Sequence, residues 1–298
     1  MNPEKVSVRL RLLSPLGRYP AADVKVGNCL LTVRDGIGFS AVVARPGRTH
    51  GLGVTHHSEI EIFALEEVRF LAAIALALPP DRGMVYAYPL PLHDDLLPAR
   101  RNGRLAGMWD ASALEMRARE MAAGIRQEDW RCSGEMLPPV SGGPPHALHD
   151  EPLDLKVLTQ ILRGTNLRDW LALRGLGALL RADMLHARRA FAEPAIMMLH
   201  VAMEASFRMV LERLKASGNP DPSAWDAGAY IDSVFNPQIV SGRYFADWYD
   251  DRIKTSHPES RLGTFAFPPL TADDFYDLRW ALHHVYVHLL ADHIWTEA

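Results

Sequence analysis

A segment rich in proline and glycine, residues 133–152, constrains how this chain of 298 residues can fold. It holds five prolines and three glycines, including two Pro-Pro pairs and one Gly-Gly pair. Neither a helix nor a strand persists through such a sequence, because proline lacks the backbone donor and glycine is costly to order. Since the chain length also favours two cores, we predict a linker over 136–152 between domains over 1–135 and 153–298.

The pattern before this linker is typical of an α+β domain. Three segments alternate hydrophobic and polar residues with a period of two: 6–12, 24–26 and 59–62. Such alternation predicts half-buried strands. Segments 66–78 and 111–127 have the hydrophobic spacing of helices. We therefore predict a mixed α+β domain over 1–135, and the sequence does not indicate its role.

The pattern after the linker is almost wholly helical. Residues 153–192 are rich in leucine, alanine and arginine. Because Gly175 and Gly177 weaken the middle of this stretch, we predict two helical segments within it. Four more helices are predicted at 194–214, 223–235, 241–256 and 271–295. The region 153–298 is therefore predicted to be an all-α helical bundle.

The charge of the chain argues against a broad basic surface for nucleic acids. The net charge is −4, and residues 151–298 hold 15 basic and 19 acidic side chains. Nonspecific binding to nucleic acids depends on cations that neutralise many phosphates. Any contact with RNA is therefore expected to be local.

The composition also bears on compartment and on disulfide chemistry. The two cysteines, Cys29 and Cys132, lie far apart without a CxxC motif, which excludes a disulfide framework and a cysteine-based zinc site. The N-terminus lacks a basic-then-apolar pattern, and the longest apolar run, 70–78, is too short to span a bilayer. We therefore predict a cytoplasmic protein that does not bind a membrane.

Arginine and histidine five positions apart recur in the sequence, and one such pair has a distinctive setting. Roughly one pair is expected by chance, whereas the chain has four: Arg45/His50, Arg181/His186, Arg252/His257 and Arg279/His284. His257 precedes Pro258, so a helix carrying Arg252 is expected to end near His257, where the two side chains can converge. A guanidinium beside an imidazole can stabilise a phosphate and transfer a proton. The alternative is that both side chains bind free carbonyls at the end of the helix.

Four polar residues recur every fourth position on the helix predicted over 194–214. They are His200, Glu204, Arg208 and Glu212, and such spacing places them on one side of a helix. One interpretation is a ladder of surface ion pairs. The other is that His200 and Glu204 support an active site by orienting its groups.

Three arginines recur every seventh residue: Arg174, Arg181 and Arg188. This spacing places them on nearly one face of a helix. The face is either solvated or a track that binds RNA phosphates.

We predict neither a metal nor a cofactor. His284 and His288 stand one helical turn apart, as zinc ligands do, but no HExxH glutamate accompanies them. The short Gly-x-Gly sequences lack the further glycine and the strand-to-helix context of a dinucleotide fingerprint, and no phosphate-binding GKS or GKT sequence occurs.

The second half of the chain resembles the HEPN domain family, in particular its Apea-like group. The resemblance covers roughly residues 155–298. It depends on an apolar helix that contains Ala-Met-Glu-Ala at 202–205, followed by the Arg-x4-His element of Arg252 and His257. It implies an α-helical bundle that forms a homodimer, in which two such elements face each other as a metal-independent ribonuclease site.

The same resemblance admits a second function. Some HEPN-like domains are binding or dimerisation modules without catalytic activity. Ile253 replaces an often polar residue after the arginine, and Asp250 and Asp251 precede it. These residues favour an inactive module that binds RNA or another ligand, whereas the intact Arg252 and His257 favour the nuclease.

Overall fold

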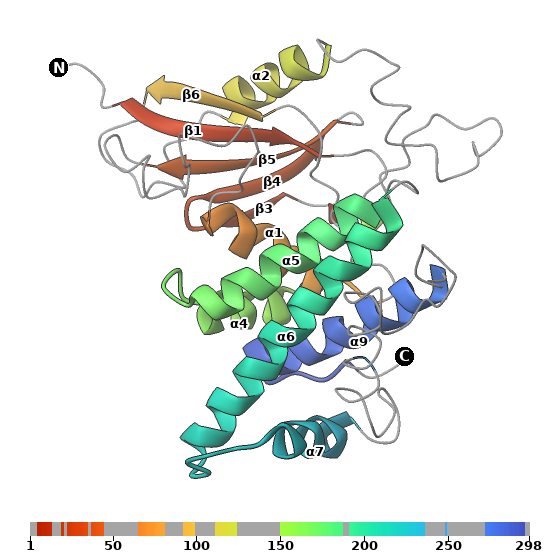
Figure 1. Ribbon diagram of the computed structural model, residues 1–298. Coiled ribbons are helices and arrows are strands. Elements are labelled where there is room, and N and C mark those ends of the chain that lie inside the picture. The colour runs from red at the N-terminus through yellow and green to blue at the C-terminus, as the bar shows by residue number, and fades with distance from the viewer. Residues whose placement is uncertain are drawn as a thin grey trace, which may run out of the picture. The chain divides into compact units, whose positions relative to one another are not determined.

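The computed structural model of this protein divides into two compact units (Figure 1). The N-terminal unit comprises Met1–Leu78 and Arg82–Leu153, and the helical unit comprises Pro79–Asp81 and Asp154–Ala298. The structure describes residues 5–13, 19–20, 23–34, 37–44, 65–80, 92–98, 111–123, 150–186, 191–235, 248 and 272–295. Of the linker predicted over 136–152, all but the last three residues lie outside these ranges.

The N-terminal unit contains a five-stranded antiparallel sheet. In spatial order its strands are β3 (Val24–Val26), β4 (Cys29–Arg34), β5 (Ile37–Ala44), β1 (Lys5–Leu12) and β6 (Leu92–Pro98). Two helices, α1 (Leu65–Ala77) and α2 (Ala111–Ala123), and a short parallel pair, β2 (Tyr19–Pro20) with β7 (Asp150–Glu151), complete the described part.

The sequence pattern identified part of this unit. Strands predicted over 6–12 and 24–26 are confirmed, as are helices that begin near residues 66 and 111. The strand predicted over 59–62 lies outside the described residues. Strands β4, β5 and β6 were not predicted, because their sequences lack a clean period of two.

Strand β1 is buried on both faces, so the prediction of a half-buried strand was wrong. Leu10 and Leu12 are buried on one face, and Arg9 and Arg11 are buried on the other. Strand β1 lies between β5 and β6. A buried carboxylate neutralises the charge of Arg11 by forming an ion pair with it. The Arg11 Nε donates to Glu67 Oε1 at 2.5 Å, and its Nη2 donates to Oε2 at 3.3 Å. The alternating pattern therefore belongs to a central strand, and its polar face is buried and holds an ion pair.

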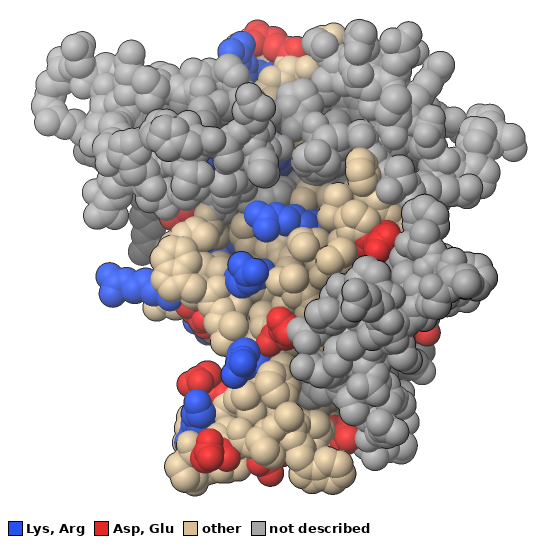
Figure 2. Space-filling model, in the orientation of Figure 1, with Lys and Arg blue, Asp and Glu red and all other residues tan. Residues whose placement is uncertain are grey.

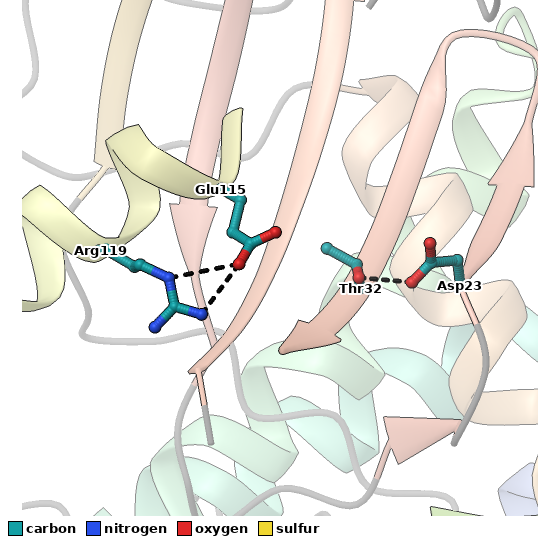
Figure 3. Close-up of polar contacts among 4 residues, drawn as sticks. All are labelled: Asp23, Thr32, Glu115 and Arg119. Atoms are coloured by element: carbon teal, nitrogen blue, oxygen red, sulfur yellow. Dashed lines mark hydrogen bonds and ion pairs between the residues drawn. The ribbon is translucent and has the colours of Figure 1, made fainter. Parts of the chain in front are cut away.

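Polar contacts also stabilise the edges of this unit (Figure 3). The Thr32 hydroxyl of β4 donates to Asp23 Oδ1 at 2.5 Å, which ties the residue before β3 to the neighbouring strand. On α2, the Arg119 guanidinium donates twice to Glu115 Oε1, at 2.8 and 3.3 Å. Both side chains are partly exposed, and surface pairs at this spacing contribute only about 0.3–0.5 kcal/mol.

The helical unit is a bundle in which α5 and α9 pack against α6. Its described helices are α4 (Leu155–Gly164), α5 (Trp170–His186), α6 (Ala192–Ala216), α7 (Ala224–Phe235) and α9 (Ala272–Ala291). Helix α4 packs on α9, and α7 packs on α6 (Figure 1). The predicted α+β then all-α arrangement is confirmed at this level. The helix predicted over 241–256 lies outside the described residues, except for Trp248, which is helical.

Stretch 153–192 forms two helices as predicted, but it divides at a different place. Helix α5 runs through Gly175 and Gly177 without a break, and the division falls at residues 165–169. Gly175 has a packing role instead: the Tyr286 hydroxyl of α9 lies so close that an added Cβ would overlap it. That hydroxyl donates to the carbonyl of Ala202 on α6 at 2.8 Å, so it links three helices at one point.

Substituting Gly175 by alanine is expected to destabilise the protein by roughly 2–4 kcal/mol, because Tyr286 must leave its buried acceptor. Gly228, in the middle of α7, is a matched control because an added Cβ would meet nothing within 4 Å. Gly228→Ala is expected to stabilise the protein by about 1 kcal/mol. Urea unfolding followed by circular dichroism measures both effects. Equal destabilisation by the two variants would contradict the packing role of Gly175.

Helix α6 is long and apolar enough, by length and composition alone, to cross a membrane, and no other helix in the described ranges is. It is also the helix that α5, α7 and α9 contact. Of the most apolar stretch of α6, 56% is buried inside the protein. Such burial is typical of the central helix of a bundle.

Candidate functional site

The Arg-x4-His pair predicted to be catalytic, Arg252 with His257, lies outside the described residues. It belongs to the part of the chain between the end of α7 at Phe235 and the start of α9 at Ala272. Both flanking helices are part of the helical unit. The structure therefore describes the bundle that carries the pair, and the pair itself stays a prediction.

Two other Arg-x4-His pairs lie on described helices, and they show how this spacing directs the two side chains of a pair. Five residues correspond to about 500° of rotation, so the two side chains of such a pair point about 140° apart on a continuous helix. On α5, Arg181 is exposed and His186 is buried, in agreement with this geometry. On α9, Arg279 and His284 are both buried, and they contact different partners.

On a continuous helix the spacing therefore separates the two side chains, and a joint site requires the chain to leave the helix near the histidine. Helix α9 continues past His284 to Ala291, and α5 is helical through His186, its last residue. His257 precedes Pro258, and a residue before proline is driven out of the helical conformation. Among the pairs at 181/186, 252/257 and 279/284, only the pair at 252/257 has a proline directly after the histidine. Arg45 and His50 lie outside the described residues.

A buried ion pair joins α5 to α9. Arg279 donates from Nε to Asp183 Oδ1 at 2.7 Å and from Nη2 to Oδ2 at 2.9 Å, and both side chains are at most 3% exposed. Burial raises the pKa of Asp183, and the adjacent guanidinium acts in the opposite direction. This arginine is fully engaged in packing, so it is unsuited to bind a substrate phosphate.

His186 follows Asp183 by three residues on α5 and is held as a neutral ring. It stacks on Phe275 with centroids 3.7 Å apart and planes 9° apart, and the edge of Tyr276 lies 5.0 Å away. Burial lowers the pKa of His186 to about 4. A neutral, stacked imidazole of this kind is a packing group rather than a proton donor.

The two histidines one turn apart on α9 have different surroundings. His284 is buried, lies against the edge of Trp280 at 4.5 Å, and has a pKa lowered to about 4 by burial. His288 Nε2 lies 2.7 Å from the hydroxyl of Tyr230 on α7. Within the described residues, no group of three or more histidine, cysteine, aspartate or glutamate side chains is placed to hold a metal ion.

The contact of His288 with Tyr230 belongs to a small network at the end of α9. Arg213 of α6 reaches the His288 carbonyl at 3.5 Å and forms an ion pair with Asp292. Burial, followed by the nearby Arg213, lowers the pKa of His288, and burial raises the pKa of Tyr230. Both groups are therefore neutral at neutral pH, and the network docks α7 on α6 and α9.

The predicted polar stripe on α6 is not continuous. His200 is buried, whereas Glu204, Arg208 and Glu212 are exposed. Each of the three steps of four residues turns about 40° around the helix, so the stripe rotates from the core to the surface. The interpretation as a surface ladder is wrong for His200. Because the structure does not describe His257, the supporting role proposed for His200 and Glu204 stays a prediction.

Two of the three arginines predicted to bind RNA are exposed on α5. Arg174 and Arg181 both point to solvent, and Arg188 lies outside the described residues. An aromatic residue that the spacing of the arginines did not indicate lies on the same face: Trp170, which is 68% exposed. Its position one turn before Arg174 was the available signal.

Comparison with models of known protein families, with curated proteins and with solved structures finds no match to this chain. The resemblance to HEPN domains therefore stays a prediction from the sequence.

Proposed function

We propose that the helical unit is the catalytic part of a metal-independent endoribonuclease of the HEPN type, which acts in the cytoplasm as a homodimer. Its site consists of Arg252 and His257 from each of two chains. The observation that carries this proposal is the contrast among the Arg-x4-His pairs. The pairs on α5 and α9 are separated or engaged in packing. Of the four pairs, only Arg252/His257 has a proline directly after the histidine, and a helix is expected to end there.

The chemistry assigned to the pair requires two proton transfers and one anion binder. One His257 takes the proton from a ribose 2′-hydroxyl, which attacks the adjacent phosphorus. The other His257 donates a proton to the leaving 5′ oxygen. Arg252 stabilises the negative charge on the phosphate oxygens during this step. The products are a 2′,3′-cyclic phosphate and a 5′-hydroxyl, and no metal-activated water is needed.

The buried histidines of the bundle are consistent with this assignment. Burial lowers the pKa values of both His186 and His284 to about 4, so neither carries a proton to donate at neutral pH. His186 lies in the last turn of α5, so its burial outweighs the preference of a helix end for a charged ring. An acid role for His257 therefore requires a ring that stays near solvent, unlike these two.

A second candidate is an inactive HEPN-like module that dimerises or binds a ligand. The excess of acidic side chains in residues 151–298, 19 against 15 basic ones, favours it. Purified protein incubated with total RNA and EDTA tests the first proposal against the second. Cleavage supports the nuclease, and intact RNA across several substrates supports the module.

The proposed mechanism requires two chains, because one Arg/His pair supplies only one proton-transfer group. Light scattering at micromolar concentration is expected to give about twice the 33.2 kDa of a single chain. The active fraction in size-exclusion chromatography is expected to coincide with that dimer. A protein that cleaves RNA while it stays monomeric at every concentration would contradict the shared site.

A further inference from the structure

An exposed face of α5 combines one tryptophan with two arginines. Trp170, Arg174 and Arg181 are all exposed, and at about 100° per residue the two arginines lie within roughly 40° of Trp170 around the helix axis. Eleven residues at about 1.5 Å each place Arg181 roughly 16 Å from Trp170 along that axis. In the orientation in which α5 crosses the front of the helical unit, basic side chains lie over this helix, and the surface between them is tan, the colour of residues other than Lys, Arg, Asp and Glu (Figures 1 and 2).

The charge of the α4–α5 region is positive where it meets solvent, although the helical unit is acidic as a whole. Five exposed cations occur in this region: Lys156, Arg163, Arg168, Arg174 and Arg181. None of them forms an ion pair with any residue in the described ranges.

The three acidic side chains of this region are all engaged. Asp154 accepts from the Lys156 and Val157 amides at the start of α4, at 2.8 and 3.0 Å. Asp169 accepts from the Ala172 amide at the start of α5 at 3.0 Å. Asp183 is buried against Arg279. Within the described ranges, the guanidinium groups of Arg174 and Arg181 therefore form no ion pair with a carboxylate.

We propose that this face of α5 binds single-stranded RNA, with Trp170 stacked on an unpaired base and Arg174 and Arg181 on successive parts of its phosphate backbone. Aromatic side chains beside a basic track suit single strands, because every unpaired base has a face that stacks and every nucleotide carries a phosphate. Duplex RNA hides its bases and offers nothing for Trp170 to stack on. The choice of RNA rests on the proposed nuclease function, and the surface would deliver an unpaired substrate strand.

The test is binding of a fluorescent single-stranded RNA to the full chain, measured by anisotropy. A 2′-O-methyl oligouridylate of about 12 nucleotides spans a site of this length and has no 2′-hydroxyl to be cleaved, so binding is read without catalysis. Trp170→Ala is expected to raise Kd about tenfold, as loss of one stacked base does. Trp225→Ala is the matched control: Trp225 is 84% exposed on α7 and precedes Asp226, and its loss is expected to leave Kd unchanged.

Salt dependence tests the arginines separately. The double variant Arg174→Ala/Arg181→Ala is expected to reduce the slope of log Kd against log salt by about 1.4, since each phosphate contact to a single strand contributes about 0.7. Arg208→Ala, an exposed arginine on α6 between Glu204 and Glu212, is expected to keep the wild-type slope. Circular dichroism confirms that each variant is folded.

The outcomes separate this surface from the catalytic proposal. Binding that depends on Trp170 supports the surface, whether or not unmodified RNA is cleaved. An equal Kd for wild type and folded Trp170→Ala, or equal affinity for duplex and single-stranded RNA, overturns it. Absence of binding by the wild-type protein at micromolar concentration also overturns it. The catalytic proposal is tested by a different measurement, the cleavage of RNA that carries 2′-hydroxyls.

Discussion

Replacing His257 with alanine is expected to lower the rate of RNA cleavage by roughly 10² to 10⁴, the usual contribution of a positioned acid or base. The variant keeps Arg252 and the bundle, so it loses proton transfer while substrate binding persists. Arg252→Ala is expected to reduce the rate through lost stabilisation of phosphate charge. Both variants should fold, because the pair is expected to lie at the end of a helix, where polar side chains contribute little to the core.

The structure supplies a better histidine control for this experiment than His284. His284 is buried against Trp280, so its alanine variant would report on packing. His293 is partly exposed after the end of α9, and His293→Ala is expected to cleave RNA at the wild-type rate. Equal cleavage by wild type, His257→Ala and His293→Ala would mean that the activity belongs to another site or to a contaminant.

Arg279→Met is expected to lower the free energy of unfolding by about 3–5 kcal/mol, the cost of leaving one partner of a buried ion pair without the other. Asp183 then stays in the α5–α9 contact without the guanidinium that donates to both of its oxygens. Methionine fills a similar volume, so the loss comes from the charge rather than from a cavity. Urea unfolding followed by circular dichroism at pH 7 measures it.

The pH dependence of that loss identifies its cause. In Arg279→Met the folded-state pKa of Asp183 lies well above the unfolded value of about 3.9, so the folded state binds a proton more readily than the unfolded state. The deficit relative to wild type is therefore expected to shrink as the pH falls from 7 toward 4. Asp183→Asn leaves a guanidinium that does not lose its proton, and its deficit should show no comparable relief. A deficit for Arg279→Met that is constant with pH would contradict the role of Asp183.

The double variant Asp183→Leu/Arg279→Met completes this comparison. Replacing both members of a buried pair by apolar groups of similar size is often neutral or stabilising. The double variant is therefore expected to be more stable than either single variant.

Local pattern predicted most of the helical unit, because amphipathic helices repeat their buried residues every three to four positions. The helical spacing of five residues predicted α6 in this way: Ile196, Leu199, Met203, Val210 and Leu214. The first four are buried and Leu214 is half-buried. The break between α4 and α5 could not be placed, since Gly175 fits a close contact with Tyr286, which lies far along the chain. Strand β1 was read as half-buried because its second buried face carries Arg9 and Arg11, which local pattern counts as polar.

The positions of the candidate side chains were predictable only where these side chains share a helix. The spacing of Arg174 and Arg181 placed both on one exposed face, and Trp170 could have been added by the same reasoning. The ion pair of Asp183 with Arg279 joins residues 96 positions apart, and no local spacing indicates such a contact. The burial of His200 likewise depends on which helices surround α6.

End-group analysis of RNA cleaved in the presence of EDTA tests the central claim most directly. Wild-type protein is expected to produce 2′,3′-cyclic phosphate and 5′-hydroxyl ends, to leave RNA of the same sequence with 2′-O-methyl groups intact, and to lose the activity on His257→Ala substitution. Cleavage that requires a divalent metal, or products with 3′-hydroxyl and 5′-phosphate ends, would contradict a site in which Arg252 and His257 act on the 2′-hydroxyl.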